Sequence, residues 1–225
     1  MRQKVSLDHL WQGLSAGMMS VALALVFIVA PREAVMGDIQ RIFYFHVASS
    51  WAGYLALLVT FVASVAYLRG RAHRWDALGS ASAEIGLVFI TGGILTGTFW
   101  AKTTWGVWWT WDPRLTTSAV LWLIYASYLL LREVMDDRAL RARVSAAYGI
   151  VGFVSVPLNF MAIRWWRAAH PLVLGSSSAG SGLAPAMLRA LIFSVASFTL
   201  FYIVLLRIRV RLEVLRDRVA ELDRQ

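Results

Sequence analysis

The sequence predicts an all-α, polytopic membrane protein with six transmembrane helices, both termini in the cytoplasm and a tryptophan-rich loop on the outer face. Two observations predict this class. First, 59% of the 225 residues are hydrophobic and only 16% are charged, whereas about a quarter of the residues in a soluble domain are charged. Second, the charged residues cluster in short segments between apolar stretches. Because the net charge of +9 lies in these segments, it does not indicate a nucleic-acid-binding surface.

Six apolar stretches of roughly 20 residues match the thickness of a bilayer core. In order they are 14–30, 43–68, 81–100, 116–131, 144–163 and 185–206. The first is expected to be retained, because its apolar run is longer than that of a signal peptide and no small-residue cleavage site follows it. The second is over-long and is expected to project from the bilayer. The fourth is short and is expected to borrow a turn from the loop before it.

Lysine and arginine are distributed unevenly between alternate loops, with fifteen on one side and six on the other. Cytoplasmic loops carry the excess of these residues, so both termini are predicted to be cytoplasmic. The outer loops then cover about 31–42, 101–115 and 164–184, and a cytoplasmic helical tail covers about 207–225. No soluble domain interrupts this pattern, and residues 1–225 are therefore expected to form a single integral membrane domain.

Tryptophan is also distributed unevenly, since only Trp11 and Trp75 fall on the cytoplasmic side. Nine fall at or near the outer side: Trp51, Trp100, Trp105, Trp108, Trp109, Trp111, Trp122, Trp165 and Trp166. An aromatic belt would populate both interfaces. The imbalance therefore predicts an apolar, aromatic surface on the outer face.

The densest group of tryptophans lies in the outer loop 101–115. The run is Trp105-Gly106-Val107-Trp108-Trp109-Thr110-Trp111-Asp112-Pro113-Arg114-Leu115-Thr116. Such rings offer a large apolar platform to a flat ligand, and Arg114 and Lys102 could meet carboxylates at its rim. Asp112 could cap the turn into the fourth span or orient Arg114. The alternative is an interfacial segment that its tryptophans merely anchor.

Two of the four histidines, His46 and His170, fall in the outer segments on either side of the tryptophan run, whereas His9 and His73 fall on the cytoplasmic side. Two imidazoles with an aromatic floor suit haem, which needs axial iron ligands and apolar contact. Its propionates would seek one of the outer arginines, Arg41, Arg114, Arg164 or Arg167. The chain has no cysteine that could serve as a thiolate ligand. An ordinary interfacial role for each histidine stays open.

The run WGVWWTWDPRLT resembles the signature WGxxWxWDxRLT of the haem-handling proteins of cytochrome c biogenesis. The matching positions are Trp105, Gly106, Trp109, Trp111, Asp112, Arg114, Leu115 and Thr116. The segments FYFHVASSW around His46 and AHPLVL around His170 resemble the two outer histidine sites of the same proteins. With six spans in only 225 residues, the chain resembles the cytochrome c maturation protein C family. The other proteins that have this signature are much longer. The resemblance covers nearly the whole chain.

This resemblance implies a protein of the bacterial inner membrane that holds haem b transiently on its periplasmic face. It implies bis-histidine ligation by His46 and His170 and presentation of the haem to the periplasmic haem chaperone, maturation protein E. The implied partners in the membrane are the ABC transporter subunits A and B and the small single-span protein D. The implied haem-contacting residues are Trp105, Gly106, Trp108, Trp109, Trp111, Asp112, Arg114, Arg41, Arg164 and Arg167. No independent catalytic site is visible, and whether the haem transfer is enzymatic stays open.

Two other functions are weighed against this one. A cytochrome b-type electron carrier holds haem between histidines inside the bilayer, whereas no histidine here lies near the middle of a span. A haem permease subunit should have broken helices at mid-depth, and Pro157 with Asn159 nearby is the only such break. Gly93 and Gly97 form a GxxxG pair that predicts close helix packing.

Overall fold

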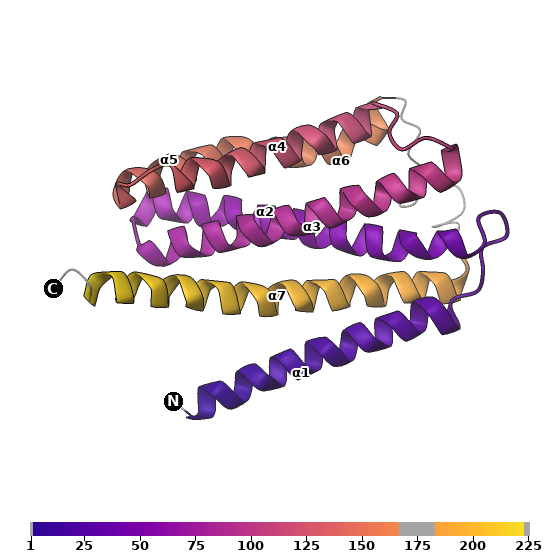
Figure 1. Ribbon diagram of the computed structural model, residues 1–225, viewed down its shortest axis with the longest axis horizontal. Coiled ribbons are helices and arrows are strands. Elements are labelled where there is room, and N and C mark those ends of the chain that lie inside the picture. The colour runs from indigo at the N-terminus through magenta and orange to yellow at the C-terminus, as the bar shows by residue number, and fades with distance from the viewer. Residues whose placement is uncertain (1, 167–182, 223–225) are drawn as a thin grey trace.

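The computed structural model describes residues 2–166 and 183–222, and its regular structure there is helical (Figure 1). Six helical segments are long and apolar enough to cross a membrane. They are Leu7–Val29, Asp38–Gly70, His73–Trp105, Pro113–Glu133, Arg138–Trp165 and Pro185–Arg216. The all-α, six-span class is confirmed, and the chain is a multi-pass membrane protein.

The helices run side by side along the long axis of the molecule (Figure 1). Their bounds are α1 Arg2–Ala24, continued by the π-helix η1 Leu25–Val29, the 3-10 helix η2 Asp38–Gln40, α2 Arg41–Gly70, α3 His73–Trp105, α4 Pro113–Glu133, α5 Arg138–Gly152, α6 Ser155–Trp165 and α7 Pro185–Leu222. The start of α1 and the end of α7 lie at the left of Figure 1, together with the α2–α3 and α4–α5 turns. We call this end of the bundle the terminal end. The α3–α4 loop lies at the opposite end, the tryptophan end.

The hairpin of α2 and α3 forms the centre of the bundle, and small residues let its two helices approach closely. A Cβ added at Gly53 would lie 2.6 Å from Ile90 Cδ1, and one at Gly86 would lie 3.1 Å from Ala56 Cβ. A Cβ at Gly93 would likewise lie 2.6 Å from Ser50 Oγ. The close packing predicted from the glycine pair in α3 is therefore confirmed. Small residues at an interface let two transmembrane helices approach closely, which increases the van der Waals contact between their backbones.

The fifth span is divided into α5 and α6, with the break at 153–154. The cause is Pro157, whose nitrogen has no hydrogen to donate to the carbonyl of Phe153. That carbonyl instead accepts a hydrogen bond from the Val156 N–H, at 3.0 Å. The break predicted at Pro157 is present, and it places Asn159 within the first turns of α6.

Several helices are longer than the apolar stretches that predicted them. Helix α3 continues to Trp105 and ends where Gly106 takes a φ of 76°, a left-handed conformation that glycine adopts easily. Helix α7 runs on to Leu222, so the tail is continuous with the last span. Helix α4 begins at Pro113, three residues before the predicted fourth stretch. It was expected to extend into the preceding loop in this way. Hydropathy marks where lipid ends, whereas a helix ends where its backbone is capped.

Ion pairs fasten the helices together at the terminal end. Arg132 of α4 makes two hydrogen bonds to the carboxylate of Asp76 in α3, at 2.6 and 3.0 Å. Both side chains of this pair are only 9% exposed. Glu84 of α3 accepts a hydrogen bond from Arg209 Nε of α7 at 2.8 Å. Asp76 and Glu84 thus each have a basic partner, as charged groups near lipid require.

Candidate functional site

The tryptophan end brings together the described site residues that the sequence predicts (Figure 1). Helix α2 contributes Arg41 and His46 near its start, and α6 contributes Arg164 near its end. The end of α3, the loop 106–112 and the start of α4 contribute the rest: Trp105, Gly106, Trp108, Trp109, Trp111, Asp112 and Arg114. Arg167 and His170 lie outside the described residues, so their contribution to the site stays a prediction.

The loop 106–112 is shaped by local hydrogen bonds at both of its ends. Lys102 Nζ donates to the carbonyl of Gly106 at 2.9 Å, which closes the end of α3. At the other end, Asp112 Oδ1 accepts a hydrogen bond from the Leu115 N–H at 2.9 Å and so caps α4. The capping role predicted for Asp112 is confirmed. Between these points Trp111 has a φ of 55°, a left-handed conformation that is rare for a residue with a side chain.

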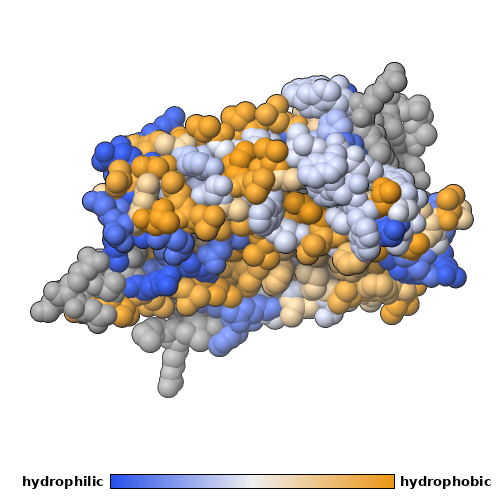
Figure 2. Space-filling view, turned by 45° about the horizontal axis from the view of Figure 1, so that its top comes forward, coloured by the Kyte–Doolittle hydropathy of each residue, from blue (hydrophilic) through white to orange (hydrophobic). Residues whose placement is uncertain are grey.

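The tryptophan rings of this loop are exposed to different extents and stand at steep angles to one another. Trp111 is 73% exposed and Trp108 is 51% exposed, whereas Trp109 is half-buried. The Trp109 and Trp111 ring centroids lie 5.8 Å apart with planes at 77°, and the Trp100 and Trp105 planes meet at 80°. The planes of these neighbouring rings are therefore nearly perpendicular, and the apolar surface is uneven. The sequence had suggested a flat platform instead. Figure 2 shows bulky, pale-coloured side chains gathered toward this end of the molecule.

His46 lies in the second turn of α2 and is half-buried against α3. Its Nδ1 lies 2.8 Å from the carbonyl oxygen of Gly93. Because a carbonyl can only accept, Nδ1 carries a hydrogen in this contact, and in the neutral ring Nε2 then carries the lone pair. A backbone carbonyl that orients a histidine in this way is typical of metal-binding imidazoles. Gly97 leaves room for the ring, since a Cβ there would lie 2.9 Å from His46 Cε1.

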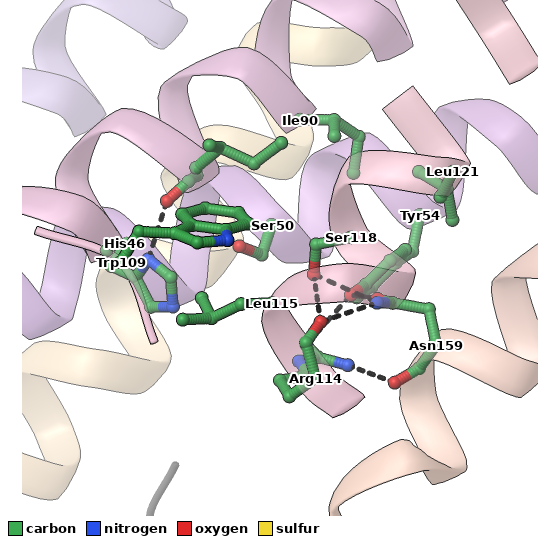
Figure 3. A pocket seen from close by; sticks show the side chains of 13 residues that line it. His46, Ser50, Tyr54, Ile90, Trp109, Arg114, Leu115, Ser118, Leu121 and Asn159 are labelled. Carbon is green, nitrogen blue, oxygen red and sulfur yellow. Dashed lines mark hydrogen bonds between the residues drawn. The ribbon is translucent and has the colours of Figure 1, made fainter. Parts of the chain in front are cut away.

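A cavity of about 40 Å³ extends from His46 into the bundle. His46 and Trp109 lie at one side of it, and Tyr54, Arg114 and Asn159 lie at the other (Figure 3). The indole N–H of Trp109 is buried and has no hydrogen-bond partner within the described part of the chain. A buried donor of this kind is usually satisfied by a water or a ligand, and the cavity is large enough for a few water molecules.

Arg114 points into the protein, away from the rim that the sequence suggested. Its Nη1 donates to the backbone carbonyl of Asn159 at 2.5 Å, and its Nη2 donates to Tyr54 Oη at 2.8 Å. Tyr54 in turn donates to Asn159 Oδ1 at 2.5 Å. Among the described residues no carboxylate forms an ion pair with Arg114. The guanidinium therefore supplies a positive charge to the inner wall of the cavity.

Asn159 is the centre of this network, and the sequence did not identify it as a site residue. Its side-chain nitrogen donates to Thr117 Oγ1 and Ser118 Oγ of α4, each at 2.9 Å. Only 1% of its surface is exposed. An asparagine in an apolar span, two residues after a proline, is the sequence signal that marks it, because a buried amide in lipid needs partners. Tyr54 has no comparable signal in the sequence.

Arg41 and Arg164 also have partners in the structure. Arg41 Nε donates to Asp38 Oδ1 at 3.0 Å, and its Nη1 donates to the carbonyl of Val26, which ties the end of the first span to α2. The guanidinium of Arg164 lies 5.3 Å from the centroid of the Phe160 ring. Both arginines are at the tryptophan end, but neither lines the cavity beside His46.

The sequence matches the heme exporter protein C family over residues 3–225. The chain belongs to this family. A heme exporter protein C of Bradyrhizobium diazoefficiens is 31% identical over 195 residues, which cover 87% of this chain and 74% of that protein. The Escherichia coli K12 heme exporter protein C is 33% identical over 187 residues, covering 82% and 74%. A putative cytochrome c biosynthesis mitochondrial protein of Marchantia polymorpha is 30% identical over 151 residues, covering 67% and 64%.

Membership of this family confirms the resemblance recognised in the tryptophan run. The structure adds the local geometry at the tryptophan end: a histidine held by a backbone carbonyl, exposed indole rings and a partly buried arginine within one end of the bundle.

Proposed function

We propose that the chain binds haem at the periplasmic face of the bacterial inner membrane and presents it to a periplasmic haem chaperone during cytochrome c biogenesis. The observation that carries the proposal is the orientation of His46, whose Nδ1 donates to Gly93 so that Nε2 is the nitrogen able to bind iron. The names of the relatives, heme exporter protein C, support haem as the cargo.

The residues at the tryptophan end suit this cargo in three ways. His46 supplies a neutral imidazole, the exposed rings of Trp108 and Trp111 supply apolar contact, and outer arginines such as Arg164 supply partners for propionates. The cavity of about 40 Å³ is far too small for a macrocycle. Haem therefore binds across the surface of this end, where its iron approaches His46.

A second axial ligand, His170, completes the proposed site, and it comes from the third outer loop. With two imidazoles bound, the iron of haem b has no open position for a substrate, which suits holding and handing over haem. The proposed recipient is the haem chaperone maturation protein E. The proposed membrane partners are the ABC transporter subunits A and B and the small protein D. The name of the relatives, heme exporter, supports an exporter complex in general and does not identify these subunits.

The spectrum of the purified protein tests the ligation. Replacing either His46 or His170 with Ala should leave some haem bound but change its spin state, because one axial ligand is lost. Replacing both should abolish haem retention and its delivery to the chaperone. His73→Ala, at the terminal end, is the control and should leave the spectrum unchanged. An unaltered haem spectrum in the double variant would exclude the proposed ligation.

The proposed orientation can be tested separately, because the chain has no native cysteine. Single cysteines at Arg71, Arg138 and Gln225 should be labelled from the cytoplasm. Cysteines at Gly106 and Ser177 should be labelled from the periplasm by a membrane-impermeant reagent. Cytoplasmic labelling of Gly106 would place the tryptophan loop on the wrong side for a periplasmic chaperone and would contradict the proposal.

One structural observation favours a second candidate, a haem permease subunit. The broken fifth span and the buried amide of Asn159 lie beside a cavity that reaches Ile90 and Leu121. Transporters often have broken helices and polar groups near the middle of the bilayer. Blocking this cavity with Ser118→Trp should stop haem from reaching the periplasm if the protein is a permease. Under the main proposal the same variant still accepts haem that is added from outside.

A further inference from the structure

A second cavity, of about 210 Å³, lies at the terminal end between α1 and α7. Its lining consists of Asp8, His9, Trp11 and Gln12 from α1, and Val204, Arg207, Ile208 and Arg211 from α7. It is thus at the opposite end of the molecule from His46 and the tryptophan loop. Its lining combines charged and apolar side chains, and the proposed haem chemistry uses none of its residues.

The charged residues of the lining, Asp8, Arg207 and Arg211, have an excess of positive charge. Asp8 Oδ1 lies 3.3 Å from Arg207 Nη2, and Asp8 Oδ2 accepts a hydrogen bond from Arg211 Nη1. One carboxylate therefore lies between two guanidinium groups and neutralises only one of them. The arginine side chains are 47% and 50% exposed, so part of each remains accessible. A guanidinium has five N–H donors in a planar fork that matches the oxygens of a phosphate group.

The depth of the cavity fits the headgroup layer of a bilayer. Its α1 residues lie in the first turns of the first span, Leu7–Val29. Those 23 residues extend about 34 Å at 1.5 Å per residue, slightly more than the hydrocarbon core of about 30 Å. Trp11 is 39% exposed, as is common at a membrane interface.

We propose that this cavity binds the phosphate headgroup of an anionic phospholipid, whose acyl chains lie along α1 and α7. Two half-exposed guanidinium groups bind the phosphate oxygens, and Val204 and Ile208 contact the glycerol end of the acyl chains. The uncompensated positive charge favours an anionic lipid over a zwitterionic one, because a basic pocket between helices attracts anionic headgroups. The lipid links α1 to α7, which the Ser197 hydroxyl also does through the carbonyl of Met18, at 3.2 Å.

Native mass spectrometry of the detergent-purified protein tests this inference with phosphatidylglycerol as the probe. Arg207→Gln combined with Arg211→Gln should weaken phosphatidylglycerol binding by roughly 30-fold, since each basic residue near a membrane surface contributes about fivefold. Arg69→Gln combined with Arg143→Gln is the matched control. It removes two exposed arginines from the same end but outside the cavity, and it should bind the lipid like the wild type.

A second variant separates the loss of a site from a loss of fold. Ile208→Trp places a larger side chain in the cavity while leaving both arginines and Asp8 unchanged. It should therefore also weaken phosphatidylglycerol binding. The inference is overturned if phosphatidylethanolamine or inorganic phosphate binds as tightly as phosphatidylglycerol. It is also overturned if the Arg207 and Arg211 double variant binds the lipid like its control. Neither outcome bears on the haem site, because the readout is lipid mass and His46 remains unchanged.

Discussion

Gly97→Ala should weaken haem binding even though residue 97 is not expected to touch haem. The added Cβ would lie 2.9 Å from His46 Cε1 and 3.1 Å from Nδ1, closer than carbon and nitrogen atoms normally approach. The ring must therefore retreat, and the 2.8 Å hydrogen bond from Nδ1 to the Gly93 carbonyl is stretched or lost. Because Gly97 lies inside α3, two turns before its end, the hydrogen-bonded backbone resists moving away to relieve the contact.

The size of the effect follows from the two interactions that change. A lost neutral hydrogen bond costs about 1 kcal/mol, and a side chain forced about 30° from its rotamer costs roughly 0.5–1.5 kcal/mol. Together these two costs make the free energy of haem binding less favourable by about 1.5–2.5 kcal/mol, because the imidazole is no longer held in its binding orientation. This corresponds to a loss of roughly 10- to 70-fold in haem affinity. The measurement is a haem titration of the purified protein, followed by the position and intensity of its Soret band.

Gly79→Ala is the matched control, because it lies in the same helix and its Cβ would make an ordinary contact, 3.5 Å from Ala63 Cβ. It should bind haem like the wild type, and circular dichroism should show equal helix content in both variants. Equal haem affinity and equal spectra for the two variants would refute the view that the α2–α3 contact orients His46.

Three further substitutions test the contacts around the site and at the terminal end. Tyr54→Phe removes the hydroxyl that accepts from Arg114 at 2.8 Å and should lower the free energy of unfolding in detergent by about 1–3 kcal/mol; an unchanged unfolding midpoint would contradict this. Asp112→Ala should cost about 1 kcal/mol through the lost cap of α4, whereas Asp112→Asn should keep the cap. Haem binding that falls equally in both Asp112 variants would instead indicate a need for its charge. Arg132→Gln should destabilise the protein by about 3–5 kcal/mol, because it leaves the carboxylate of Asp76 buried without its partner. The double variant Asp76→Leu with Arg132→Met should recover most of that loss of unfolding free energy.

The sequence predicted the number of spans, and hence that the tryptophan loop lies at the end opposite the first and last helix ends, because hydropathy reports on the bilayer directly. The side of the membrane that this loop faces remains a prediction. It also predicted the cap at Asp112 and the break at Pro157, since both are local effects of a few neighbouring residues. The assignment of His46 and His170 as a ligand pair remains a prediction. Helix ends were less predictable, because α3 continues into polar residues until Gly106 provides a cap.

The partners of Arg114 could not be predicted from the sequence. Asn159 is 45 residues away along the chain and Tyr54 is 60 residues away, and no periodic pattern connects positions on three different helices. An exposed arginine beside tryptophans indicates a rim that meets carboxylates. Only the packing of α2, α4 and α6 reveals that its guanidinium points inward. The angles between the indole rings depend on packing in the same way.

The left-handed backbone at Trp111 has a consequence for any effort to stabilise this protein. A residue with a side chain loses roughly 1 kcal/mol or more in that conformation, whereas glycine does not. Trp111→Gly should therefore relax the loop while removing its most exposed ring. A directed-evolution screen for heat resistance would favour glycine at this position, and a screen for haem delivery would reject it. Under the proposed function, a thermostable variant with Trp111→Gly that was chosen without a haem assay would therefore bind haem less well.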